Sequence, residues 1–222
     1  MQRQAHRLIE KQTEKIIRFF SCMIETKDEY TLAHSHHVCV IVGKICELLP
    51  ADYRVDSVAL QTAALLHDLG KIHTPDEILN KAGALTEEEM EIVRRHPADG
   101  KALPQETPFQ PFGDWILYHH ERMDGKGYYG LQGDAIPLES RIIAIADVFS
   151  ALRTYRIYRP AKGINETIEI MRAGRGGQFD AQILDAFLAL DKDVLANLEC
   201  NCEICRRRRE ALEKNVQCKV SP

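Results

Sequence analysis

Apolar residues recur with the period of an α-helix along most of this chain. Stepping by fours and threes from His34 meets Val38, Ile41 and Ile45, which predicts a helix over residues 31–49 with His34 on its inward face. Similar spacing or capping signals predict further helices over residues 4–27, 58–68, 86–96, 112–120, 138–154, 165–174 and 180–190. We therefore predict an all-α fold.

Histidine and aspartate residues interrupt the apolar faces of these predicted helices. An imidazole or a carboxylate on such a face needs a compensating partner, and both groups are common metal ligands. Taken one at a time, a core histidine bonded to backbone, or an aspartate paired with a neighbouring arginine, is also an ordinary interpretation. Together they predict a cation cluster inside a helical domain. The residues concerned are His34, His67, Asp68, His96, His119, His120 and Asp147.

Composition narrows the functional classes. The chain has 222 residues, of which 45% are hydrophobic and 28% charged, which is ordinary for a soluble globular protein. Its formal net charge of -4 provides no general basic field, so we expect no nucleic-acid polymer as a partner. Because there is neither an apolar run of about 20 residues nor a signal-peptide core, we also expect no membrane span and a cytoplasmic location.

Three segments are predicted along the chain. Residues 1–29 form an amphipathic N-terminal helix, residues 30–195 one helical domain, and residues 196–222 a tail rich in cysteine and arginine. The helix or the tail could serve a homodimer or a protein partner. The tail fits either a structural metal site or reduced thiols with a redox-sensitive pair, and both interpretations stay open. The cysteines concerned are Cys200, Cys202, Cys205 and Cys218.

An ordered series of motifs covers about residues 30–190. In this order and composition, the series resembles the HD-GYP family, a branch of the HD superfamily of metal-dependent phosphohydrolases. A single His-Asp pair would be a weak signal, whereas the ordered series is specific. The series reads His34-Ser-His-His-Val, His67-Asp68-Leu-Gly-Lys71, Arg95-His96-Pro, His119-His120-Glu-Arg-Met-Asp-Gly-Lys-Gly127-Tyr128, and Ala144-Ile-Ala-Asp147.

The resemblance implies an all-helical bundle with metal ions at its centre and a phosphodiesterase that hydrolyses cyclic di-GMP or a related cyclic dinucleotide. The implied metal ligands are the seven inward residues named above. His34, His67 and Asp147 would hold chiefly one ion, and His96, His119 and His120 chiefly the other, with Asp68 bridging the two.

Further roles follow from the same resemblance. Asp68 and Lys71 are the expected catalytic residues, with Lys71 offering its charge to the scissile phosphate. Lys71, Arg156 and Arg159 are the expected substrate-binding residues. For Glu121 we expect a hydrogen bond that orients one imidazole. The ring of Tyr128 or that of Tyr158 would either stack on a base or serve packing alone.

Departures from the family pattern bear on the ions and the substrate. Tyr30 stands where three-metal members carry glutamate, so we expect two divalent transition-metal ions, iron or manganese ahead of nickel or zinc. Tyr129 replaces the proline of the family's name, and residues 155–159 lack the usual aspartate and proline. The expected substrate is therefore cyclic di-GMP, cleaved to the linear dinucleotide or GMP. Cyclic GMP-AMP or a non-catalytic receptor or interaction role is the alternative.

Overall fold

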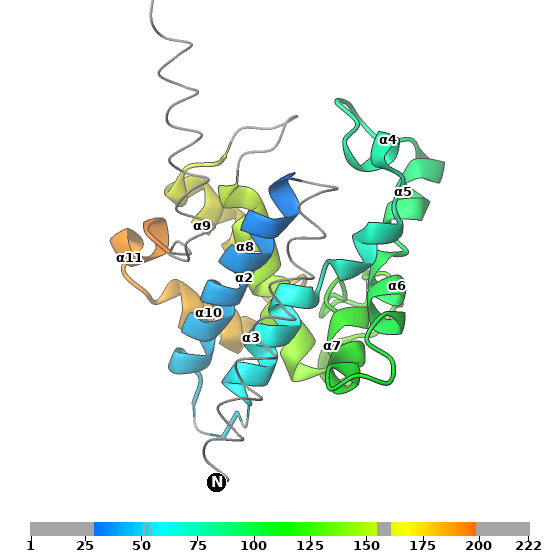
Figure 1. The fold of residues 1–222 in the computed structure, drawn as a ribbon. Coiled ribbons are helices and arrows are strands. Elements are labelled where there is room, and N and C mark those ends of the chain that lie inside the picture. The colour runs from blue at the N-terminus through cyan, green and yellow to red at the C-terminus, as the bar shows by residue number, and fades with distance from the viewer. Residues whose placement is uncertain (1–28, 51, 54, 155–160, 199–222) are drawn as a thin grey trace, which may run out of the picture.

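The computed structural model describes residues 29–50, 52–53, 55–154 and 161–198. Within these ranges the backbone is helical, and the extended pairing consists of one isolated bridge between Arg175 and Phe179. The predicted all-α fold is confirmed (Figure 1). The α-helices are α2 (Glu29–Leu48), α3 (Ser57–Leu66), α4 (Asp76–Leu79), α5 (Glu87–Val93), α6 (His96–Ala102), α7 (Gly113–Leu117), α8 (Leu138–Arg153), α9 (Ile164–Ala173), α10 (Ala181–Leu188) and α11 (Lys192–Ala196); the 3-10 helices are η1 (Leu69–His73), η2 (Gln110–Phe112) and η3 (Gly133–Ala135).

Helices α2, α3 and α8 form the centre of the bundle. Their apolar faces meet in one core, to which α9, packed on α8, and α10, packed on α2, add further side chains (Figure 1). The predicted stripe of α2 lies in this core, with Val38, Ile41 and Ile45 fully buried. Burying such apolar surface is the main driving force for assembling the bundle.

A second layer, made of η1, α6 and α7, packs beside this core. Gly70 in η1 touches the start of α6 so closely that a Cβ on it would lie 2.0 Å from the His96 carbonyl oxygen and 2.5 Å from the Gly100 nitrogen. A glycine two residues after the helix predicted over residues 58–68 is typical of a helix end. The structure shows a different role, because α3 ends at Leu66 and Gly70 permits the contact between η1 and α6.

Helix ends follow local capping chemistry. Thr86 and Glu89 form the predicted capping box at the start of α5. Asp180 accepts hydrogen bonds from two backbone N–H groups and caps α10, also as expected. A proline next to the end of the helix predicted over residues 86–96 is typical of a helix break. In the structure, Pro97 instead sits at the second position of α6 and helps to start that helix.

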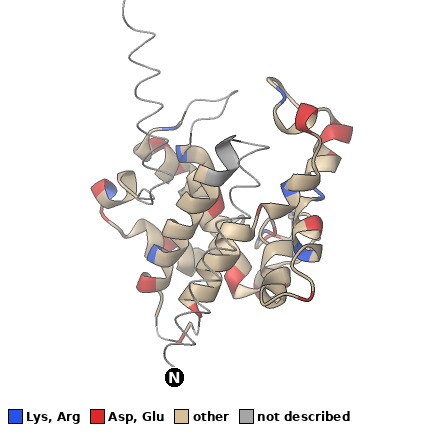
Figure 2. Ribbon diagram, viewed as in Figure 1, with Lys and Arg blue, Asp and Glu red and all other residues tan. Residues whose placement is uncertain are grey.

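Charged residues are distributed over the outer helices. Figure 2 shows acidic segments on α4 and α5, and both acidic and basic residues scattered over the other helices. Within the described ranges, no helix combines the length and apolar character needed to span a bilayer.

Candidate metal centre

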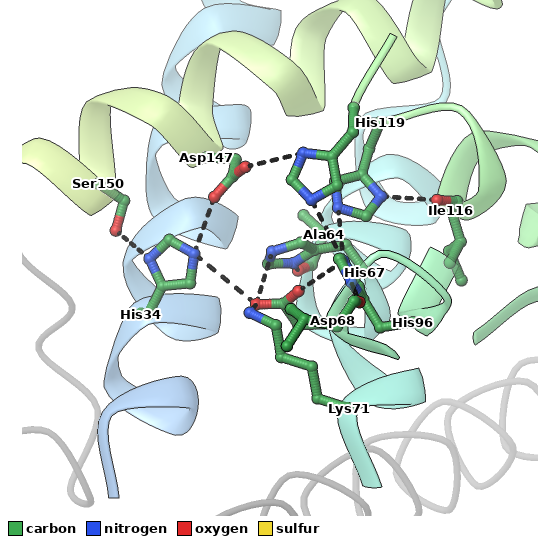
Figure 3. Close-up of polar contacts among 12 residues, drawn as sticks. His34, Ala64, His67, Asp68, Lys71, His96, Ile116, His119, Asp147 and Ser150 are labelled. Carbon is green, nitrogen blue, oxygen red and sulfur yellow. Dashed lines mark hydrogen bonds and ion pairs between the residues drawn. The ribbon is translucent and has the colours of Figure 1, made fainter. Parts of the chain in front are cut away.

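The seven residues singled out from the sequence come together in one place. His34 lies on α2, His67 and Asp68 follow α3, and Asp147 lies on α8. His96 begins α6, and the pair His119 and His120 follows α7. All are buried except His120, which is partly buried. Figure 3 labels all of them except His120 and shows the labelled side chains converging from separate elements on a single centre.

The backbone orients three of the histidines in the same way. The Nδ1–H group of each donates to a carbonyl three residues earlier: His67 to Ala64 at 2.7 Å, His96 to Val93 at 2.7 Å, and His119 to Ile116 at 2.6 Å. Each carbonyl belongs to the last turn of a helix, where carbonyl groups lack an intrahelical partner. The Nδ1 proton is thereby assigned, so the Nε2 lone pair of each neutral ring points into the centre.

His34 is oriented by side chains instead. Its Nδ1 lies 2.9 Å from Ser150 Oγ and its Nε2 lies 2.9 Å from Asp147 Oδ1. Among the described residues, the Asp147 carboxylate bonds to a histidine and pairs with no arginine, which was the ordinary alternative for this residue. Ser150 was not recognised from the sequence, although a polar residue one turn after Asp147 in an apolar helix was a usable signal.

The possible ligand atoms of the described residues form three groups of three. The group of His67, Asp68 and His119 overlaps the other two, which share no residue and are here called the two sets. One set joins His34, His67 and Asp147, and the other joins His96, His119 and His120, with the atoms of each set within 4.8 Å of one another. In the second set, His96 Nε2 lies 3.2 Å from His120 Nε2 and 3.5 Å from His119 Nε2. The two sets bring together the residues that the family resemblance assigns to separate ions, and that assignment stays a prediction.

Asp68 lies between the two sets. Its Oδ2 is 3.4 Å from His67 Nε2, and its Oδ1 is 3.3 Å from His96 Nε2. The Lys71 Nζ also contacts Oδ2, at 2.6 Å, so this lysine belongs to the centre and is not a free surface residue. One carboxylate thus presents a different oxygen to each set, as a bridging ligand requires.

Electrostatics keep most of these imidazoles neutral. Burial lowers the pKa of His96 to about 3 and that of His120 to about 4. Burial also lowers the pKa of His119 well below its ordinary value. Neutral imidazole is the form that binds metals.

The carboxylates and His67 shift in the opposite sense. Burial alone would raise the pKa of Asp68, but the positive charge of Lys71 and the contact with His67 hold it well below its ordinary value. Burial would likewise raise the pKa of Asp147, but the hydrogen bond from His34, together with the charges of His34, His120 and His67, lowers it. For His67, burial alone would lower the pKa, but the Asp68 carboxylate raises it. The centre therefore holds ionised carboxylates that favour a cation beside His67.

These contacts fit a bound metal. With their Nδ1 protons donated to carbonyls, neutral His67 and His96 direct Nε2 lone pairs toward the oxygens of Asp68. A cation between nitrogen and oxygen, whether a proton or a metal ion, relieves this repulsion. In addition, His67 Nε2 is fully buried and has no hydrogen-bond partner among the described residues. The donor set of imidazole and carboxylate, without thiolate, suits iron, manganese, nickel or zinc.

The loop after the histidine pair is organised by two acids. Glu121 was expected to orient an imidazole, but its oxygens accept hydrogen bonds from the backbone N–H groups of Tyr129 and Leu131. The Glu121 carboxylate therefore bonds to the loop backbone and not to an imidazole of the centre. Asp124 accepts bonds from Lys126 N and the Arg122 side chain, and this guanidinium lowers its pKa to about 2.

Several expected residues lie outside the described ranges. These are Arg156, Tyr158 and Arg159, the four tail cysteines Cys200, Cys202, Cys205 and Cys218, and the predicted helix over residues 4–27. Their roles stay predictions.

A helical bundle enclosing a histidine and aspartate centre defines a class of metal-binding domain. A family model described as HD domain matches residues 18–183 of the sequence. The chain therefore belongs to the HD domain family, and the resemblance drawn from the motifs is confirmed.

Curated relatives agree with this assignment. Over 169 residues the chain is 41% identical to the 3′3′-cGAMP-specific phosphodiesterase 1 of Vibrio cholerae. This alignment covers 75% of this chain and 39% of that protein. The chain is 39% identical over 184 residues to the cyclic di-GMP phosphodiesterase response regulator RpfG of Xanthomonas campestris, covering 81% of this chain and 48% of the relative. The chain thus spans less than half the length of both relatives.

A solved structure shares the fold. The protein Bd1817 of Bdellovibrio bacteriovorus, described as an HDG"Y"P protein, superposes with a TM-score of 0.54 at 18% identity. The superposition covers 73% of this chain and 50% of the other.

Proposed function

We propose that this chain is a metal-dependent phosphodiesterase that hydrolyses cyclic di-GMP to the linear dinucleotide, to GMP, or to both. The observation that carries the proposal is the position of Asp68, with one carboxylate oxygen facing each set of histidines. His34, His67 and Asp147 would hold one divalent ion, and His96, His119 and His120 the other, with iron or manganese ahead of nickel or zinc. When bound, such a pair activates a water molecule and stabilises charge on the attacking and leaving oxygens.

The side chains around the ions have separate tasks in this proposal. Lys71, whose Nζ lies beside Asp68, would place a positive charge at the scissile phosphate. Ser150 keeps the His34 ring in place through Nδ1. Arg156 and Arg159 would bind the second phosphate or the Hoogsteen edge of a guanine, since a guanidinium matches both.

Cyclic GMP-AMP is the second candidate substrate. A relative that is 41% identical is named for specificity toward 3′3′-cGAMP, which supports this alternative. The substitutions at Tyr155 and Ile157, relative to the family pattern, are a second reason to test this substrate, because they alter the segment that carries Arg156 and Arg159. A non-catalytic receptor or interaction module is a weaker candidate, because a receptor has no need of the complete ligand set.

Product analysis tests the proposal directly. Purified protein with quantified metal is incubated anaerobically with cyclic di-GMP and, in parallel, with 3′3′-cGAMP, and products are separated by chromatography. Linear dinucleotide or GMP, formed at about two metals per chain, is the expected result. Hydrolysis of cGAMP alone would transfer the proposal to the second substrate, and full metal occupancy without hydrolysis of either would contradict it.

Substrate binding is tested by Arg156→Ala, with Arg172→Ala as the matched control. Arg172 lies on α9 and pairs with Glu169. We expect Arg156→Ala to raise KM with the metal content unchanged, and Arg172→Ala to leave both unchanged. An unaltered KM in Arg156→Ala would remove this arginine from the proposed substrate site.

A further inference from the structure

Glu121 is a buried carboxylate that follows directly after a metal-centre histidine, His120. Its side chain is only 3% exposed. One oxygen accepts the backbone N–H of Tyr129 at 2.7 Å, and the other accepts that of Leu131 at 2.6 Å. No ion pair to it occurs among the described residues, so backbone donors compensate its charge. Such charge-assisted hydrogen bonds in a buried setting are strong.

The loop is folded closely around this carboxylate. A Cβ at Gly127 would lie 2.5 Å from the Glu121 Cα and 2.7 Å from its Oε1, so only glycine fits there. Gly125 and Gly130 have φ values of 73° and 76°, which glycine adopts readily. The backbone path from residue 125 to residue 130 is therefore built for contact with Glu121.

The loop places the ring of Tyr128 at the edge of the metal centre. The ring centroid of Tyr128 lies 4.7 Å from that of His120, with the planes tilted by 40°. The guanidinium carbon of Arg94 lies over the Tyr128 ring, 6.0 Å from its centroid. Tyr128 is nevertheless 42% exposed, so part of it faces solvent beside the centre.

We propose that Glu121 is a positioning residue for substrate: by bonding the loop backbone, it holds Tyr128 beside His120 as an aromatic wall at the partly exposed edge of the metal centre. This inference rests on the proposed function. With Arg94 next to it, the wall combines an aromatic ring with a guanidinium, a pairing that suits a purine base and the phosphate attached to it. Glu121 acts through Tyr128 and does not touch the reacting phosphate.

Glu121→Gln is the informative change because it keeps the shape of the side chain. The amide retains one acceptor oxygen but turns an N–H2 group toward a backbone N–H, so one hydrogen bond is lost. We expect kcat/KM for the cyclic dinucleotide to fall roughly tenfold, mainly through KM, as for the loss of one charge-assisted bond. Metal content and the hydrolysis of bis(p-nitrophenyl) phosphate, which is too small to need the wall, should stay unchanged.

Two further variants show whether the effect passes through Tyr128. In a Tyr128→Ala background, Glu121→Gln should add little to the rise in KM. Asp56→Asn is the matched control, since Asp56 also accepts two backbone N–H groups but does so at the far end of α3. A wild-type KM in Glu121→Gln would overturn the proposal. So would fully additive effects of the two substitutions on KM, or an equal loss of activity on the cyclic dinucleotide and on bis(p-nitrophenyl) phosphate.

Hydrogen exchange provides a readout that does not depend on turnover. The amides of Tyr129 and Leu131 should exchange slowly in the wild-type chain and markedly faster in Glu121→Gln. Unchanged exchange at both amides would overturn the positioning role even if the chain hydrolyses cyclic dinucleotides. Faster exchange in a chain that hydrolyses none of them would instead locate the failure in the proposed function.

Discussion

The Nε2 atoms of His96 and His120 face each other across 3.2 Å, although the two residues come from different elements of the bundle. The Nδ1 proton of His96 is already donated to the Val93 carbonyl, so its Nε2 carries a lone pair when the ring is neutral. Burial keeps both rings neutral by lowering their pKa values to about 3 and about 4. The centre is thus prepared to receive a cation between them.

The lowered pKa of His120 predicts how the metal-free protein responds to acid. Below pH 6.5 the unfolded chain protonates this histidine, while the folded chain does not until about pH 4. The unfolded state then binds more protons, so stability falls as the pH falls through this window. Between pH 7.5 and pH 5, the wild-type chain should lose about 1–2 kcal/mol more than His120→Gln. Urea unfolding of chelator-treated protein measures the difference, and identical pH dependence of the two chains would contradict it.

Asp68→Asn should release metal and abolish hydrolysis together. The amide keeps the shape but loses the negative charge that faces both histidine sets. We expect fewer than two ions per chain and a fall in kcat of at least about a hundredfold. Metal analysis and the chromatographic assay give the result, with Asp99→Asn, a change at a partly exposed residue of α6, as the control. Wild-type activity in Asp68→Asn would exclude a bridging carboxylate mechanism.

Gly70→Ala tests the contact between η1 and α6. The new Cβ would meet two backbone atoms, which cannot move without shifting His96. Destabilisation of about 1–3 kcal/mol is expected, together with weaker metal binding. Gly83→Ala is the control, because nothing lies within 4 Å of a Cβ at that position. Equal midpoints of urea unfolding for the two variants would show that the contact is less tight than described.

Ser150→Ala removes the partner of His34 Nδ1. Losing the group that orients a metal-binding imidazole typically lowers metal affinity about 10–100-fold. Competition with a chelator of known affinity measures this change. Ser140→Ala on the same helix is the matched control, since that buried hydroxyl donates to the Trp115 carbonyl instead. If both serine variants bind metal like the wild-type chain, His34 is held without its hydroxyl partner.

The features that could be predicted from sequence are those that depend on local spacing. Apolar positions three and four apart located α2 and α8, and a polar residue on such a face marked His34 and Asp147. The helix cap at Asp180 could also be predicted, because the backbone N–H groups that donate to its side chain lie only two and three residues later in the sequence.

Contacts between distant segments could not be read in this way. The role of Gly70 depends on His96, which belongs to another helix. Nothing in the residue types of this glycine and this histidine predicts that they are in contact. Glu121 was assigned to the wrong partner for a related reason. Its partners are set by the path of the loop, and the pattern of glycines shows that a loop exists without showing where its N–H groups point.

The bonds from His67, His96 and His119 to carbonyls three residues earlier have a consequence for divergence and engineering. Their partner is main chain, which every amino acid supplies, so Ala64, Val93 and Ile116 can be replaced by other apolar residues of similar size without loss of the ring orientation. His34 differs, since its orientation depends on a side chain that mutation can remove. A designer transplanting this centre would therefore have to carry Ser150 along with the ligands, but would need only helix ends of the right length for the other three.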